Sequence, residues 1–151
     1  MTVAELRPAA PTDAAPYSPL DLERCLTRIN EQLVLRTGSD AWWSSLGRSL
    51  DELATALRRH AEETGGSDGL HGQILEHEPR LAFEVRGLER DHVDLAADVR
   101  ELQALVAASP GQPGAVPRTL AATTEVVARI RGHQRRLGTV LHEAYQRDLG
   151  D

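Results

Sequence analysis

The sequence is poor in several residue types, and each shortage excludes a class of protein. It has one cysteine, Cys25, in 151 residues, so it forms no internal disulfide and no CxxC zinc site. Lysine is absent: all 17 basic residues are arginine, against 23 acidic residues, for a net charge of −6. An acidic chain without a basic cluster is a poor candidate for binding nucleic acid. No stretch reaches the ~18–20 continuous apolar residues of a membrane span, so we expect a cytoplasmic protein without membrane contact.

Aromatic residues make up only 3% of the chain, and β-branched residues are outnumbered by Leu, Ala, Glu and Arg. These four are strong helix formers, so the composition predicts an all-α protein held together by leucine and alanine packing. Residues 1–18 contain three prolines and little to bury, and we expect them to form a flexible leader. Residues 19–150 have the length of one typical domain.

Apolar residues recur at spacings of three and four in four long segments, which is the period of an amphipathic helix. We expect helices over about residues 19–36, 40–64, 78–108 and 117–148, with a short connector of one or two helical turns at 70–77. Turns rich in Gly, Ser and Pro separate them. Four amphipathic helices with short links predict an up-down-up-down antiparallel four-helix bundle.

Three of the six histidines occupy stripe positions that otherwise hold Leu or Val. His60, His92 and His133 fall in three different predicted helices, at heights that agree within one or two turns. Buried imidazoles need partners, and one shared ligand would satisfy all three. Inward imidazole and carboxylate side chains on facing helices are typical of metal sites in bundles. Glu63, three residues after His60, adds a carboxylate to this candidate metal site.

No pairing of a nucleophile with a base, and no pair of carboxylates, supports a reaction, so we expect no enzyme and no catalytic residue. Asp91 and Glu89 flank His92 but are expected to point away from its stripe. His71 and His77 lie in the connector beside acidic residues, where we expect them to be solvated.

Two adjacent tryptophans open the segment 40–64. Trp43 belongs to the apolar stripe, whereas Trp42 is expected to lie to one side. Trp42 is either a plug at the end of the bundle or an exposed anchor for an unknown protein partner. The chain is expected to be a monomer or a homodimer.

Three segments resemble motifs of the hemerythrin-like (HHE-type) bundle proteins. LRRHAEE at 57–63 is similar to the family's second-helix L-x-x-H-x-x-x-E motif, and LERDHVDL at 88–95 to its third-helix L-x-x-E-H-x-x-L motif. RGHQRRL at 131–137, followed by HEAYQRDLG at 142–150, resembles the fourth-helix H-x-x-x-E and a closing E-A-Y/F-x-x-D-I-G. The resemblance covers about residues 20–150.

The resemblance implies a four-helix bundle that, in active relatives, holds a non-haem di-iron centre binding dioxygen or sensing redox state. Thr64 and Leu137 stand where the family has acidic ligands, Glu63 is displaced by one residue, and the first-helix ligand is absent. We therefore expect a non-catalytic protein with a degraded or partial non-haem metal site. Its ligands are expected to be His60, Glu63, His92 and His133.

Other functions stay open on the sequence alone. One is a working iron-, oxygen- or redox-sensing site on the same histidines, completed by Glu63 and water. Another is a helical interaction module without a ligand, and a third is a phosphotransfer bundle that uses an exposed histidine such as His142. The expected cofactor is accordingly none, or non-haem iron with an incomplete ligand set.

Overall fold

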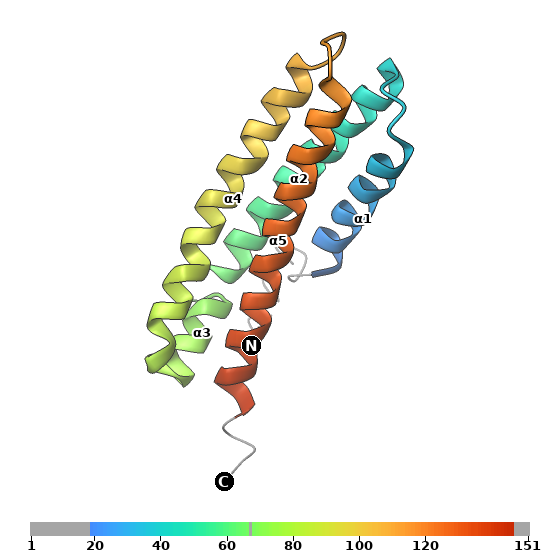
Figure 1. Cartoon of the computed structure of the whole chain (residues 1–151). Helices are drawn as coiled ribbons and strands as arrows, with labels where there is room; N and C mark the ends of the chain where they lie inside the picture. The colour runs from blue at the N-terminus through green and yellow to red at the C-terminus, as the bar shows by residue number, and fades with distance from the viewer. Residues whose placement is uncertain (1–18, 67, 147–151) are drawn as a thin grey trace, which may run out of the picture.

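The computed structural model describes residues 19–66 and 68–146, which form helices joined by short loops (Figure 1). The elements are α1 (Pro19–Leu35), α2 (Asp40–Thr64), α3 (Leu70–His77), the 3-10 turn η1 (Pro79–Leu81), α4 (Ala82–Ala108) and α5 (Ala115–Gln146). No strand occurs among these described residues, so the all-α prediction is confirmed. The expected leader at residues 1–18 lies outside the described residues, as does the expected end of the last helix at 147–148.

The described part of the chain contains five α-helices, whereas the sequence predicted four long helices and a connector. The connector forms α3. The long helix expected from Glu78 begins instead with η1, and α4 starts at Ala82, because Pro79 has no N–H and favours the first turn of a helix. The last helix begins two residues earlier than predicted, at Ala115, which leaves Pro117 in its first turn, where proline is tolerated.

The loop between α1 and α2 fixes the start of α2. Ser39 is the N-cap residue, and its side chain accepts a hydrogen bond from the backbone N–H of Trp42 at 3.1 Å. Trp42 is only 5% exposed, and its Nε1 donates to the carbonyl oxygen of Gln32 in α1 at 2.8 Å. Of the two roles left open for Trp42, the structure supports the buried plug and excludes the exposed anchor.

The helices pack around two separate apolar clusters. α2 packs along α1 and α4, and α4 packs along α5. α1 has 17 residues against 25 in α2, and α3 lies at the end of the molecule that α1 does not cover, against α2, α4 and α5 (Figure 1). The larger cluster joins α1, α2 and the adjoining halves of α4 and α5. The smaller cluster joins α3, η1 and the remaining halves of α4 and α5.

The stripes predicted from the spacing of apolar residues are the buried faces of the helices. In α2 all seven predicted positions between Trp43 and Thr64 are buried, and in α5 all seven between Thr123 and Ala144 are buried. Burial of these Leu, Val and Ile side chains contributes roughly 25 cal/mol per Å² of apolar surface to stability. The same stripes carry His60 and His133 into the interior.

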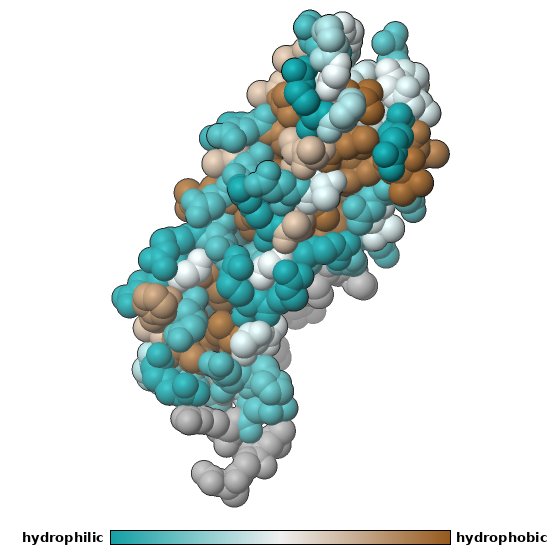
Figure 2. Space-filling view, viewed as in Figure 1, coloured by the Kyte–Doolittle hydropathy of each residue, from teal (hydrophilic) through white to brown (hydrophobic). Residues whose placement is uncertain are grey.

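Charged and polar side chains cover much of the surface. Figure 2 shows hydrophobic side chains mainly toward the upper part of the face drawn, over α1 and α5. Val34 and Leu35, near the end of α1, are among the exposed large hydrophobic residues. Of the described helices, none combines the length and the apolar character needed to cross a membrane.

Candidate metal centre

Three histidines from three helices meet inside the molecule. His60 of α2, His92 of α4 and His133 of α5 each offer one ring nitrogen, and these nitrogens lie within 4.8 Å of one another. His60 and His133 are buried, and His92 is partly buried. The three ring centroids are 4.9–5.2 Å apart. The structure therefore brings together the three histidines that the sequence singled out.

These histidines lie between the two apolar clusters. Along α4, His92 is placed between Leu88 of the smaller cluster and Leu95 of the larger one. In α5 the order along the chain is reversed, and His133 lies between Ile130 of the larger cluster and Leu137 of the smaller one. The polar group therefore interrupts a continuous apolar interior, at the height where α3 replaces α1 as a neighbour of α2.

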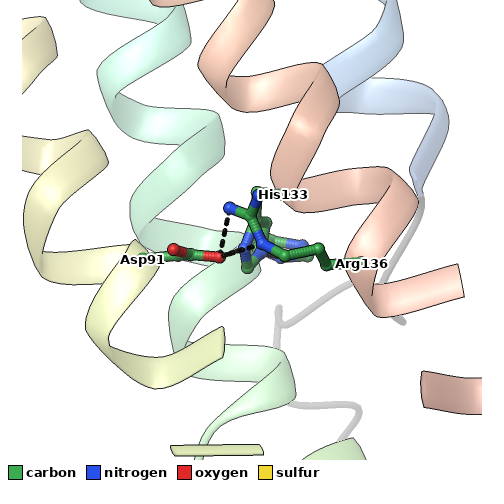
Figure 3. A network of polar contacts seen from close by, with 4 residues as sticks. Asp91, His133 and Arg136 are labelled. Atoms are coloured by element: carbon green, nitrogen blue, oxygen red, sulfur yellow. Dashed lines mark hydrogen bonds and ion pairs between the residues drawn. The ribbon is translucent and has the colours of Figure 1, made fainter. Parts of the chain in front are cut away.

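Asp91 fixes the orientation of His133. Its Oδ2 atom is 2.9 Å from His133 Nδ1 and also accepts hydrogen bonds from Arg136 Nε at 3.1 Å and Nη2 at 2.6 Å (Figure 3). The sequence placed Asp91 off the stripe of His92 but did not predict that it contacts His133 and Arg136 of α5. Asp91 lies off the buried stripe of α4, and that position faces α5 rather than solvent.

These contacts define which ring nitrogen of His133 donates to Asp91. A carboxylate only accepts, so Nδ1 of His133 carries the proton and donates it to Asp91. In the singly protonated form of His133, the form that can bind a metal, the lone pair is then on Nε2, which faces His60 Nε2 at 3.0 Å. His60 is accordingly the donor of that hydrogen bond. Asp91 thus directs the lone pair of His133 Nε2 toward His60 and the centre of the histidine group, where it accepts the hydrogen bond from His60.

A fourth histidine, which the sequence analysis placed in solvent, is buried beside the group. His71 of α3 is 1% exposed, and its ring stacks on that of His92 with centroids 5.4 Å apart and planes at 13°. Its Nδ1 lies 3.6 Å from Oε1 of Glu89. The expectation of a solvated side chain holds for His77, which is exposed, and is wrong for His71. We call His60, His71, His92 and His133 the histidine layer.

The predicted carboxylate ligand does not belong to the three-histidine group. Glu63 is partly exposed and contributes no atom to it. Thr64, the next residue, is fully buried, and its hydroxyl donates to the backbone oxygen of His60 at 2.7 Å. The inward position one turn after His60 is therefore taken by a hydroxyl that cannot replace a carboxylate ligand.

Burial shifts the titration of the layer. It lowers the pKa of His60 to about 3 and that of His92 to about 4, and the neighbouring imidazoles add to both effects. Burial also lowers the pKa of His71, although the charge of Glu89 opposes this. For Asp91, burial alone would raise the pKa, but hydrogen bonds with His133 and Arg136 outweigh it and leave the pKa below its usual value. The shifted imidazoles are neutral at pH 7, the form that binds metals.

The three-histidine group fits one transition-metal ion. Metal–nitrogen bonds of ~2.0–2.1 Å in a tetrahedral site place two ligand nitrogens ~3.3 Å apart. The Nε2 atoms of His60 and His133 are 3.0 Å apart, and the widest separation within the group is 4.8 Å. Small side-chain movements would therefore bring all three nitrogens to bonding distance.

The same residues do not fit a di-iron centre. Di-iron sites in helical bundles use several inward Glu side chains together with histidine. The candidate group found in residues 19–66 and 68–146 contains three histidines and no carboxylate. Asp91 is held by His133 Nδ1 and Arg136, and Glu89 faces His71, so neither bridges the centre. Comparisons with known protein families, characterised proteins and solved structures found no match for this chain.

Proposed function

We propose that this chain is a hemerythrin-like four-helix bundle protein that binds a single transition-metal ion and does not catalyse a reaction. The proposed ligands are His60, His92 and His133. The observation that carries the proposal is the convergence of these three imidazoles, from three helices, to within 4.8 Å in the interior. Glu63 is left out of the ligand set because it contributes no atom to this group.

The energetics of the layer favour a ligand over a purely structural role. A buried imidazole without hydrogen-bond partners costs on the order of 1–3 kcal/mol, and Leu at the same position would carry no such cost. Nε2 of His92 is buried and has no hydrogen-bond partner. A metal ion would engage that nitrogen together with the lone pair of His133.

The partner of His133 also supports metal binding. Metal-bound histidines typically donate their second ring N–H to a carboxylate, which fixes the ring and makes the other nitrogen a better ligand. Asp91 holds His133 Nδ1 in this way, and Arg136 in turn holds Asp91. Imidazole ligands suit Zn, Cu, Fe and Ni, so the chemistry of the site favours an ion of this class over Mg²⁺ or Ca²⁺.

Element analysis of the purified protein tests this proposal. Protein produced in medium supplied with iron and zinc is expected to contain one equivalent of metal, and the His92→Ala variant is expected to contain none. His142→Ala is the matched control, because His142 is an exposed histidine at the far end of α5. Equally little metal in wild type and His92→Ala would refute the proposal, and two irons per chain would refute the single-ion site.

A further inference from the structure

His71 is the least satisfied buried polar side chain of the histidine layer. It is 1% exposed, and neither Nδ1 nor Nε2 has a hydrogen-bond partner among the described residues. Oε1 of Glu89 lies 3.6 Å from Nδ1, close enough for an ion pair but beyond hydrogen-bonding distance. A buried imidazole in this state carries a desolvation cost that the charge of Glu89 offsets only in part, since the pKa of His71 stays below its usual value.

The surroundings of His71 repeat those of His133. Asp91 faces Nδ1 of His133 at 2.9 Å, and Glu89 faces Nδ1 of His71 at 3.6 Å. Both carboxylates belong to α4 and stand within three residues of His92. A carboxylate at Nδ1 leaves Nε2 as the metal-binding nitrogen, which is the usual arrangement around histidine ligands.

The spacing of the rings agrees with coordination of a common ion, although the ring of His71, which is nearly parallel to that of His92 at 13°, would have to turn to direct a nitrogen at that ion. Imidazoles that share a tetrahedral ion with bonds of ~2.0–2.1 Å have ring centroids ~5 Å apart. The centroid of His92 lies 5.1 Å from that of His60, 4.9 Å from that of His133 and 5.4 Å from that of His71. His71 is the outermost of the four, since it is not part of the 4.8 Å group.

We infer that His71 is the fourth ligand of the proposed metal site, which makes it an all-imidazole, four-coordinate centre of the kind that Zn²⁺ or Co²⁺ occupies. The inference rests on the proposed function. Nε2 of His71 would complete the ligand set, and Glu89, 3.6 Å from Nδ1, would hold the other ring nitrogen. Catalytic sites of this geometry have three protein ligands and keep the fourth position for water or substrate. With four histidine ligands, the proposed site would have no open position for a small molecule.

Histidine-ring NMR spectra of the wild-type protein test the inference without a substitution. Long-range ¹H–¹⁵N spectra are recorded before and after addition of one equivalent of Zn²⁺. We expect one ring nitrogen of each of His60, His71, His92 and His133 to shift on binding, while the rings of His77 and His142 stay unchanged. Shifts in only three layer histidines would overturn the role of His71 and leave the three-ligand site intact.

Zinc affinity of matched variants provides a second readout. Competition with a chromophoric chelator is expected to show at least a tenfold loss for His71→Leu and no change for His77→Leu, a substitution on the exposed face of the same helix. Glu89→Gln is expected to weaken binding by less than His71→Leu. Equal affinity of His71→Leu and wild type would overturn the inference alone, whereas no zinc binding by the wild type would overturn the proposed function as well.

Discussion

At the scale of single residues, the histidine layer places polar side chains where apolar ones would stabilise the fold more. His92 occupies a stripe position between two leucines, and its Nε2 is buried without a hydrogen-bond partner. Leucine fills a similar volume and needs no partner. The chain therefore keeps a polar residue where its own pattern calls for an apolar one, as expected of a functional site.

His92→Leu separates binding from stability. We expect the metal-free variant to be about 1 kcal/mol more stable than metal-free wild type at pH 7, because the unsatisfied nitrogen is removed. The variant should at the same time lose metal binding. Urea unfolding followed by circular dichroism measures the first effect, with His142→Leu as control. A clear loss of stability would show that His92 serves the fold.

Asp91 has a different role, since it acts through His133. Asp91→Asn is expected to weaken metal binding by about 10–100-fold, because the amide no longer fixes the tautomer and basicity of His133 as a carboxylate does. The control is Asp94→Asn, an exposed position about one turn further along α4. Metal competition assays on both variants measure the effect, and equal affinities would contradict the role of Asp91.

At the scale of elements, α3 is the segment that connects the short loop after α2 to the histidine layer. Gly69 is its N-cap residue. A Cβ at Gly69 would collide with the backbone oxygen of Gly65 and approach that of Thr64 to 2.8 Å. Only glycine lets the chain turn this closely at the end of α2. This turn places α3 so that His71 lies beside the other three histidines of the layer.

Two glycine substitutions are expected to have opposite effects. Gly69→Ala should destabilise the protein by 1 kcal/mol or more, on the order expected of a steric conflict with backbone atoms. Gly47→Ala, inside α2, should stabilise it by up to ~1 kcal/mol, because a Cβ there meets nothing within 4 Å and alanine favours the helix. Thermal unfolding of both variants measures the difference. A stabilising Gly69→Ala would contradict the close turn.

At the scale of the whole molecule, the layer makes stability depend on pH. The folded pKa values of His60 and His92, about 3 and 4, lie below the ordinary value of 6.5 that the unfolded chain has. Between these limits the unfolded chain binds protons that the folded chain does not, so protonation favours unfolding. The imidazoles of His60 and His92 face the other histidines of the layer, and the carboxylates near the layer are those of Asp91 and Glu89.

We therefore expect the metal-free protein to be fully stable above pH 6.5 and to lose stability steadily as the pH falls toward 4, by an amount on the order of a few kcal/mol. The double variant His60→Leu/His92→Leu should show a much flatter profile over the same range. Urea midpoints at a series of pH values measure both. Parallel profiles for the two proteins would contradict the assigned cause.

The sequence predicted the buried stripes well because their spacing alone identifies the face that each helix buries. The positions of His60, His92 and His133 followed from that pattern. Asp91 and His71 did not, for separate reasons. Asp91 is one residue off the stripe, and whether it meets solvent or α5 depends on where the neighbouring helix lies. His71 sits in a short segment, and its burial depends on how α3 packs against α2, α4 and α5.

The placement of the histidine layer between two apolar clusters has a consequence for the cooperativity of unfolding. The half built on α3 and the half built on α1 share the helices α4 and α5, but the histidine layer separates their apolar clusters, so without a bound ion we expect the two halves to open as separate cooperative units. An ion coordinated by histidines from four helices would link the two halves, so that they unfold in one transition. Amide exchange along α5, which runs through both halves, would then change from two classes of protection to one.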